Sequence, residues 1–324
     1  MRLRGVEWGH VLNASGARGF AGEGYWFHDL SRLVGLRYDG STFVTKTTTL
    51  MPRAGNMWLD DDHRPLALVP DCIVVRPMAG VVLNAVGLSG PGAKEVLAKL
   101  RVRRDLKRVV VSFMSVDKTP EARVSEAHSF LHMFRAFIRT KGTDNVALQV
   151  NFSCPNVGLD PTHLMDEVTQ VLDRSVDLGV ATMIKLNALV APEVACKLAE
   201  HEGCDAVVCS NTIPWGQMPD VIGWKQLFGS EESPLARYGG GGLSGKPLLP
   251  VVEGWIRRAV QLGMKKPIVG GGGILHADDA DRLLDAGASA VELGSVSILR
   301  PWRVSGIIRS VNRRLGATPV EDAA

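Results

Sequence analysis

Short apolar runs recur along this chain, and each ends in small or polar residues, mostly ahead of a helical pattern. We count eight, and they end near Asn13-Ala-Ser-Gly16, Thr45-Lys-Thr47, Ser112, Asn151, Lys185-Leu186, Ser210-Asn-Thr212, Gly270-Gly-Gly-Gly273 and Gly294-Ser295. Strands that alternate with helices predict a parallel sheet, and eight of them predict a closed (β/α)8 TIM barrel. The 324 residues suit one such barrel, and no linker divides them. We therefore predict a single α/β domain over residues 1–324.

Four segments between these runs have the pattern of helices. Residues 121–140 carry apolar side chains at helical spacing. Residues 161–178 and 192–202 each begin at a proline, which suits the first turn of a helix. Residues 278–286 begin with acidic side chains, which the positive end of the helix dipole favours. These segments support the alternation that the barrel requires.

Two segments are too long for one loop and one helix, namely residues 50–108 and 213–266. We interpret both as insertions at the carboxyl end of the barrel, where insertions usually cover an active site. The first contains Asn84-Ala-Val-Gly-Leu88 and the second contains Gly241-Gly-Leu-Ser-Gly-Lys-Pro-Leu248.

Composition excludes several classes of protein. A net charge of +3 with interspersed signs does not resemble a nucleic-acid-binding surface. The five cysteines are scattered and form no C-x-x-C pair, which favours a reduced, cytoplasmic compartment. The N-terminus has no apolar segment typical of a signal or membrane anchor. His128 and His132 are four residues apart but lack an acidic ligand nearby, so we expect no metal site.

Cys154 lies in the polar turn Asn151-Phe-Ser-Cys-Pro-Asn156, directly after an apolar run. An unperturbed thiol has a pKa of about 8.5, so this cysteine is a feasible general base. The alternative is a buried structural cysteine, which is the common fate of this residue type. Its position between Ser153 and Pro155 in a polar turn favours the catalytic interpretation.

Lys46 and Lys185 each end a different predicted strand. A lysine there keeps its charge only if an anionic or polar group faces it. Facing a flavin, such lysines would stabilise the negative charge of the reduced ring. Either lysine alone would more often reach the surface, but the occurrence of both at strand ends favours a functional role.

Glycines follow the last two predicted strands, at Gly270-Gly-Gly-Gly273 and Gly294-Ser295. In TIM barrels this pair of loops is a frequent phosphate site, because glycine lets backbone N–H groups approach an anion. One glycine run alone could be a tight turn. Two runs after the right pair of strands favour phosphate binding.

Four asparagines, Asn84, Asn151, Asn156 and Asn211, lie on four predicted loops. A cluster of amides suits a small planar ligand that carries carbonyls, N–H groups and a carboxylate. Any one of them is more often a turn residue, and their convergence is a hypothesis at this stage.

Taken together, these motifs resemble the dihydroorotate dehydrogenase family of FMN-containing (β/α)8 barrels. The resemblance covers nearly the whole chain, and its most specific parts are 151–156, 241–248, Thr45-Lys-Thr47 and Arg53-Ala-Gly-Asn56. It implies a flavoprotein oxidoreductase of pyrimidine biosynthesis that acts on a CH–CH bond. Cys154 would remove a proton from C5 of dihydroorotate while a hydride passes from C6 to N5 of FMN.

The resemblance also implies a set of site residues. The catalytic pair would be Cys154 and Lys46. The substrate would be held by Lys46, Asn84, Ala85, Val86, Gly87, Leu88, Asn151, Asn156, Asn211 and Thr212. FMN would be held by Ser15, Lys46, Thr47, Asn151, Lys185, Ser210, Gly245, Gly272, Gly273, Gly294 and Ser295, the last four at its phosphate.

A cysteine base is similar to the class 1 enzymes rather than the membrane-bound class 2 enzymes, which carry serine. Class 1 members pair as dimers and pass electrons to fumarate, or to NAD through a separate subunit, so the acceptor is open. Residues 84–90 read Asn-Ala-Val-Gly-Leu-Ser-Gly where the family usually has Asn-Ser-Met-Gly-Leu-Pro-Asn. The second hypothesis is therefore an FMN enzyme for another pyrimidine or related unsaturated substrate. A non-redox barrel that binds a phosphorylated ligand is the remote alternative.

Overall fold

Eight parallel strands form a closed barrel in the computed structural model, which describes residues 1–152 and 161–316. Along the sheet the order is β3, β14, β13, β10, β9, β8, β7, β4. A parallel bridge between Leu12 and Thr42 joins the two end strands and closes the ring. The strands are β3 (Val11–Asn13), β4 (Phe43–Val44), β7 (Val109–Phe113), β8 (Val146–Asn151), β9 (Ala181–Leu186), β10 (Ala206–Cys209), β13 (Ile268–Gly271) and β14 (Ala290–Leu293). The predicted (β/α)8 barrel is confirmed, and all eight predicted strand ends are found.

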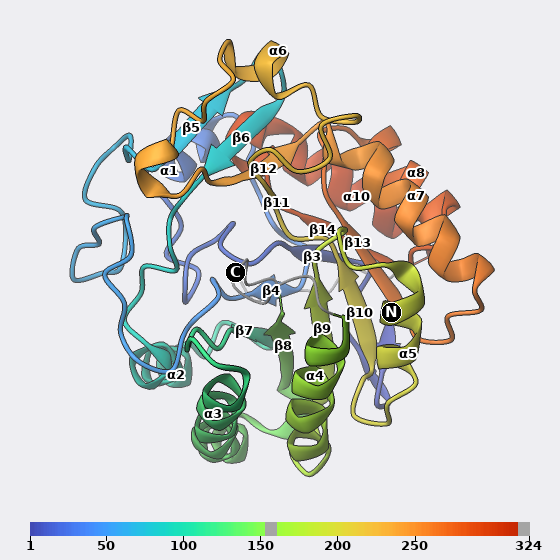
Figure 1. Ribbon diagram of the computed structural model, residues 1–324. Coiled ribbons are helices and arrows are strands. Elements are labelled where there is room, and N and C mark those ends of the chain that lie inside the picture. The colour runs from blue at the N-terminus through green and yellow to red at the C-terminus, as the bar shows by residue number, and fades with distance from the viewer. Residues whose placement is uncertain (153–160, 317–324) are drawn as a thin grey trace.

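Helices surround the barrel (Figure 1). They are α1 (Trp26–Leu33), α2 (Ala93–Val102), α3 (Pro120–Lys141), α4 (Pro161–Val176), α5 (Pro192–Ala199), α7 (Leu248–Gln261), α8 (Ala277–Asp285) and α10 (Val304–Arg314). The four predicted helices are confirmed, and α4 and α5 end slightly before their expected limits. Helix α3 begins where Thr119 accepts a hydrogen bond from the Ala122 N–H and Pro120 occupies the first turn.

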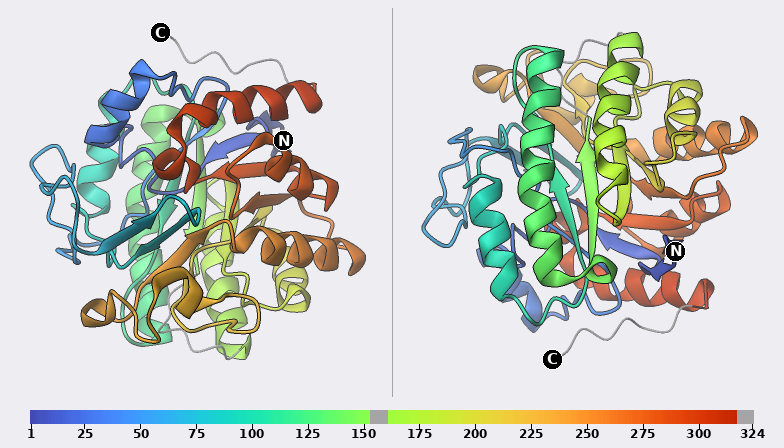
Figure 2. Two further views of the ribbon diagram at one scale, coloured as in Figure 1. Left: turned by 90° about the horizontal axis from the view of Figure 1, so that it is seen from above. Right: turned by 90° about the horizontal axis from the view of Figure 1, so that it is seen from below.

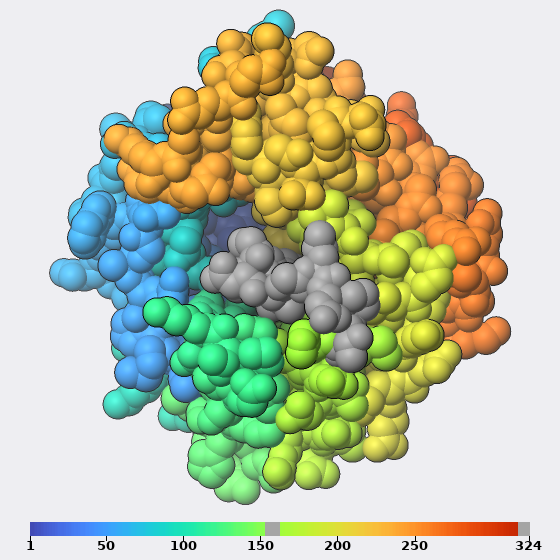
Figure 3. Space-filling model, in the orientation of Figure 1, coloured from blue at the N-terminus to red at the C-terminus, as the bar shows by residue number. Residues whose placement is uncertain are grey.

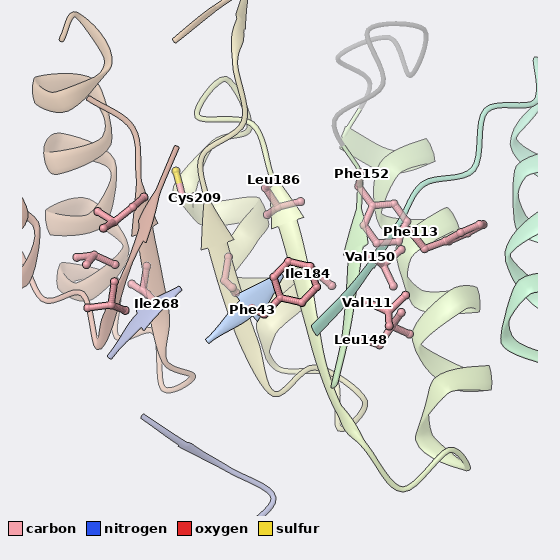
Figure 4. Packing of buried hydrophobic residues seen from close by; sticks show 14 of the residues in the cluster. Phe43, Val111, Phe113, Leu148, Val150, Phe152, Ile184, Leu186, Cys209 and Ile268 are labelled. Atoms are coloured by element: carbon pink, nitrogen blue, oxygen red, sulfur yellow. The ribbon is translucent and has the colours of Figure 1, made fainter. Parts of the chain in front are cut away.

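Alternation along each strand separates an outer core from the barrel interior. Leu148 and Val150 on β8 point outward and pack with residues such as Phe113 and Phe152 beneath the helices (Figure 4). Their neighbours Ala147 and Gln149 therefore face the interior, because successive side chains of a strand point to opposite sides. The lower interior is apolar and includes Val110, Ala147, Met183 and Ala290.

The N-terminal hairpin seals the amino end of the barrel. Strands β1 (Arg2–Leu3) and β2 (Val6–Glu7) pair antiparallel, and Met1, Leu3 and Trp8 pack into the apolar interior. Figure 2 shows the N-terminus on the side of the molecule away from the second insertion. Access to the interior is thereby left to the opposite, carboxyl end.

The two insertions pair with each other into one antiparallel sheet at the carboxyl end. Strands β5 (Ile73–Arg76) and β6 (Val81–Asn84) come from the first insertion, and β11 (Ile213–Pro214) and β12 (Gly242–Gly245) from the second. Asn84 of β6 is opposite Gly242 of β12. In Figure 3 the two insertions lie side by side on this face, and a hollow opens beside them.

Candidate active site

A layer of polar side chains lies directly above the apolar interior of the barrel. Ser112, Gln149, Lys185 and Glu292 each stand two residues beyond an apolar lumen residue of the same strand, so they face the lumen together. The Lys185 ammonium donates to Glu292 Oε2 at 2.5 Å, and Gln149 Nε2 donates to Glu292 Oε1 at 3.2 Å. Every one of these four side chains is buried. The lumen is therefore polar at this level, and its four side chains are hydrogen-bonded to one another.

The same network continues to two of the predicted cofactor residues. Ser112 Oγ donates to Gln149 Oε1 at 3.2 Å and lies 3.0 Å from Thr47 Oγ1. Ser15 Oγ lies 2.6 Å from Thr47 Oγ1. Ser15, Thr47 and Lys185, which the sequence places on three strand ends, thus belong to one connected group.

Lys46 projects from the end of β4 toward the first insertion. Its Nζ donates to the Ser89 carbonyl at 2.5 Å and lies 4.7 Å from the centre of the Phe20 ring. Burial lowers the pKa of Lys46 to about 8, because a desolvated ammonium is disfavoured, and Glu23 only partly offsets this. Because the Lys46 ammonium is already largely desolvated, an anionic ligand could pair with it at little further desolvation cost.

Three of the predicted substrate asparagines converge on one side of the barrel mouth. Asn211 Nδ2 donates to Asn151 Oδ1 at 3.1 Å, and Asn211 Oδ1 accepts from the Thr212 N–H at 2.9 Å. Asn84 joins them through β12, since its Nδ2 donates to the Gly242 carbonyl at 3.3 Å beside Thr212. The amides therefore form a single group.

The loop Ala85–Gly90 connects that amide group to Lys46. Asn56 Nδ2 donates to the Ala85 carbonyl at 2.7 Å, and the Val86 carbonyl accepts from the Asn56 N–H at 2.9 Å. Gly87 and Leu88 both have positive φ, +71° and +58°, so the backbone turns back on itself here. This turn brings Ser89 within reach of the Lys46 ammonium.

The glycine loops meet on the side of the mouth next to β10. Gly271 of β13 is paired with Glu292 of β14, so the following residues Gly272, Gly273, Gly294 and Ser295 lie on adjacent loops. The start of α7 packs against them, because a Cβ on Gly273 would lie 2.6 Å from Leu249 N and 3.0 Å from the Gly245 carbonyl. Ser210 also reaches this side, since its N–H donates to the Gly271 carbonyl at 2.7 Å.

These loops suit an anion. Within the described residues, the N–H groups of Gly273, Gly294 and Ser295 donate to no carbonyl or side chain outside the regular helix and strand hydrogen bonds. Backbone N–H groups next to a helix N-terminus are a common phosphate site. The residues present therefore fit the phosphate that the sequence predicts.

Two predicted residues, Cys154 and Asn156, lie outside the described residues. What the structure describes is the start of their turn, where Asn151 ends β8 at the amide group and Phe152 packs outward. The other predicted residues lie at the mouth of the barrel. They belong to the network of the polar layer, to Lys46 and the loop Ala85–Gly90, to the amide group or to the glycine loops.

Sequence reasoning missed Glu292, Gln149 and Ser89. The signal for the first two is a single polar residue in an otherwise apolar run, Ala290-Val-Glu-Leu293 and Ala147-Leu-Gln-Val150. A charged residue in a buried strand needs a partner, so such an interruption marks a lumen position. Ser89 contacts Lys46 through its backbone carbonyl, and no side-chain pattern predicts that contact.

Two cysteines outside the site are structural. Cys204 and Cys209 are fully buried, and burial raises the pKa of Cys204 to about 12.

We find no helix in the described ranges that is long and apolar enough to cross a membrane.

The fold and site define a class of TIM-barrel proteins whose mouth combines two glycine loops, two lysines and a set of amides. A sequence profile for dihydroorotate dehydrogenase matches residues 8–315. The chain therefore belongs to the dihydroorotate dehydrogenase family, a family of oxidoreductases.

Individual relatives agree with this assignment. The chain is 30% identical to the catalytic subunit of dihydroorotate dehydrogenase B (NAD(+)) from Streptococcus pneumoniae, over 93% of this chain and 86% of the relative. It is 31% identical to the same subunit from Anoxybacillus flavithermus, over 92% and 84%. A putative dihydroorotate dehydrogenase A (fumarate) from Pediococcus pentosaceus is 29% identical over 93% and 88%.

A solved structure shows the same fold. The dihydroorotate dehydrogenase of Eimeria tenella, crystallised with ferulenol, superposes with a TM-score of 0.68 at 20% identity. The match covers 98% of this chain and 84% of that one.

Proposed function

We propose that this chain oxidises dihydroorotate to orotate in pyrimidine synthesis, with FMN as its cofactor. The observation that carries the proposal is the joint placement of Lys46 and the amides of Asn84, Asn151 and Asn211 around one barrel mouth. A charged ammonium and several amides are the donors and acceptors that a carboxylated pyrimidine ring requires. Family membership supports the same reaction.

FMN would be held by the glycine loops and by side chains around the polar layer. Gly272, Gly273, Gly294 and Ser295 would hold its phosphate, and Gly245, whose carbonyl lies close to Gly273, would complete that site. The flavin ring would lie over the polar layer, where Ser15, Thr47, Lys185, Asn151 and Ser210 would hold it. When bound, FMN accepts the hydride that leaves the substrate.

The protein's own residues would handle binding and the proton. Lys46 would pair with the substrate carboxylate and touch the flavin. Residues 84–88, with Asn151, Asn156, Asn211 and Thr212, would orient the ring. Cys154 would remove the C5 proton, and we assign it from its place three residues after Asn151, which ends β8 at the amide group.

Anaerobic titration tests the proposal. The purified protein should show a flavin absorption band that bleaches when dihydroorotate is added without oxygen. Cys154→Ala should keep the band and bleach at least about a hundredfold more slowly, since general base catalysis contributes about 10²–10⁴-fold. Cys196→Ala, on the outer helix α5, is the matched control and should bleach at the natural rate.

Each failure has a distinct meaning. A flavin band that persists with dihydroorotate but bleaches with another dihydropyrimidine would show that the substrate is that other member of the same chemical class. The absence of any flavin band after reconstitution with FMN would overturn the proposal. If Cys154→Ala bleaches as fast as the natural protein, Cys154 is not the base. The assignment of dihydroorotate as substrate would be unaffected.

A further inference from the structure

A buried carboxylate lies beside Lys185, and the proposed function leaves it without a role. The Glu292 side chain is 1% exposed, and its Oε2 is 2.5 Å from Lys185 Nζ. Strands β14 and β9 are separated in the sheet by β13 and β10, so this ion pair crosses the lumen. Burying a carboxylate is costly unless it is paired and hydrogen-bonded, so a position like this calls for an explanation.

The hydrogen bonds define the charge state of Glu292. Its Oε2 accepts from the Lys185 ammonium and its Oε1 from the Gln149 amide nitrogen, and neither donor has a lone pair to give back. Both carboxylate oxygens are therefore acceptors, as in an ionised group. Gln149 is itself oriented by Ser112, whose hydroxyl donates to Gln149 Oε1.

The pair therefore presents almost no net charge to the space above it. A lone Lys185 would present a full positive charge at the level where the predicted flavin lies. Glu292 offsets that charge at contact distance. A flavin gains negative charge on reduction, so the balance of this pair acts directly on the reduction equilibrium.

We propose that Glu292 is a positioning residue that holds Lys185 in place. By neutralising the positive charge of Lys185, it lowers the reduction potential of the flavin. This inference rests on the FMN site proposed above. A lower potential makes the reduced cofactor a stronger reductant toward its electron acceptor. It also makes reduction by the substrate less favourable, so the carboxylate sets the balance between the two half-reactions.

The Glu292→Gln variant removes the charge and keeps the shape and an acceptor oxygen. Leaving Lys185 unneutralised should raise the equilibrium constant for two-electron reduction about tenfold, since an opposing charge is lost at short range. Tenfold corresponds to about 30 mV for two electrons, measurable by equilibration with a reference dye. Sulfite, an anion that binds oxidised flavin, should bind about tenfold more tightly, and neither readout requires turnover.

The Glu253→Gln variant is the matched control. Glu253 lies on α7 and pairs with Arg257 and Arg282 at the surface, so the variant removes the same charge from the protein elsewhere. Its potential and sulfite affinity should equal those of the natural protein. An equal shift in this control would show that only overall charge matters and would overturn the proposal.

A double variant keeps the test decisive if Glu292→Gln fails to fold with a lone buried ammonium. Lys185→Gln combined with Glu292→Gln is again neutral, so its potential should return toward the natural value. An unchanged potential and sulfite affinity in Glu292→Gln, or a double variant displaced as far as the single one, would overturn the role of Glu292. A natural protein that binds no FMN would instead overturn the proposed function.

Discussion

The ammonium of Lys46, at the end of β4, donates a 2.5 Å hydrogen bond to the carbonyl of Ser89, 43 residues further along the chain. This bond links the barrel to the turn of the first insertion that contains Gly87 and Leu88. The lysine that would bind the substrate carboxylate therefore also holds the loop that would cover the ring. Changes to Lys46 should affect both.

Replacing Lys46 by methionine should weaken orotate binding about 10- to 100-fold. The variant loses a hydrogen bond from a charged donor, which contributes about 1.5–3 kcal/mol. Calorimetric titration of orotate into the FMN-loaded protein measures the change. Lys94→Met, at an exposed position on α2, removes the same charge and should bind orotate normally. If Lys46→Met binds orotate as tightly as the natural protein, Lys46 does not pair with the orotate carboxylate.

The affinity for orotate should fall as the pH rises through about 8. The pKa of Lys46 in the ligand-free protein is about 8 instead of its ordinary 10.5, so the ammonium is lost in this range. The unfolded chain keeps that proton up to about pH 10.5, so this group's contribution to stability increases with pH between about 8 and 10.5. Titrations at pH 6.5, 8 and 9.5, with Lys46→Met as reference, separate this effect from other groups. A parallel decline in both proteins would contradict it.

Gly273→Ala should destabilise the protein and loosen FMN. The residue has φ of +78°, and its new Cβ would lie 2.6 Å from Leu249 N at the start of α7. We expect a loss of about 1–3 kcal/mol in the free energy of unfolding and a raised dissociation constant for FMN. Gly254→Ala, within α7 and with open space around it, should instead stabilise by about 0.5–1 kcal/mol. Urea unfolding and flavin fluorescence give the two quantities, and matching effects of the two variants would contradict the packing argument.

The ion pair of Arg123 and Glu167 should be essential for stability. It joins α3 to α4 behind the end of β8, with side chains only 3% and 4% exposed and a separation of 2.7 Å. Arg123→Met leaves Glu167 buried without this partner, which costs about 3–5 kcal/mol. Arg257→Met breaks a surface pair and should cost at most about 1 kcal/mol. Urea unfolding compares them, and a small effect of Arg123→Met would mean that water reaches the pair.

Strand ends and helix starts were predictable because their signals are local. An apolar run that ends at Asn151 or Lys185 forms a strand that must be buried on both faces up to that residue. This requirement does not depend on the rest of the sequence. Likewise Pro161 and Pro192 suit only the first turn of a helix. The glycines after β13 and β14 follow the same logic, since the chain must turn there.

The partners across the lumen were not predictable in this way. Glu292 and Lys185 are 107 residues apart, and only closure of the ring brings β14 opposite β9. The same holds for Asn84 and Gly242, which are 158 residues apart and join the two insertions. These contacts depend on barrel register, and no local pattern encodes that register.

Local sequence thus specified the eight strands, the lysines and amides at their ends, and the glycine loops, because periodicity and turn chemistry act over a few residues. Tertiary structure decided which of these groups meet and what charge they present together. Lys185 is the clearest case. Its position at a strand end is visible in the sequence, while its neutralisation by Glu292 arises only when a closed barrel buries both charges in one low-dielectric space.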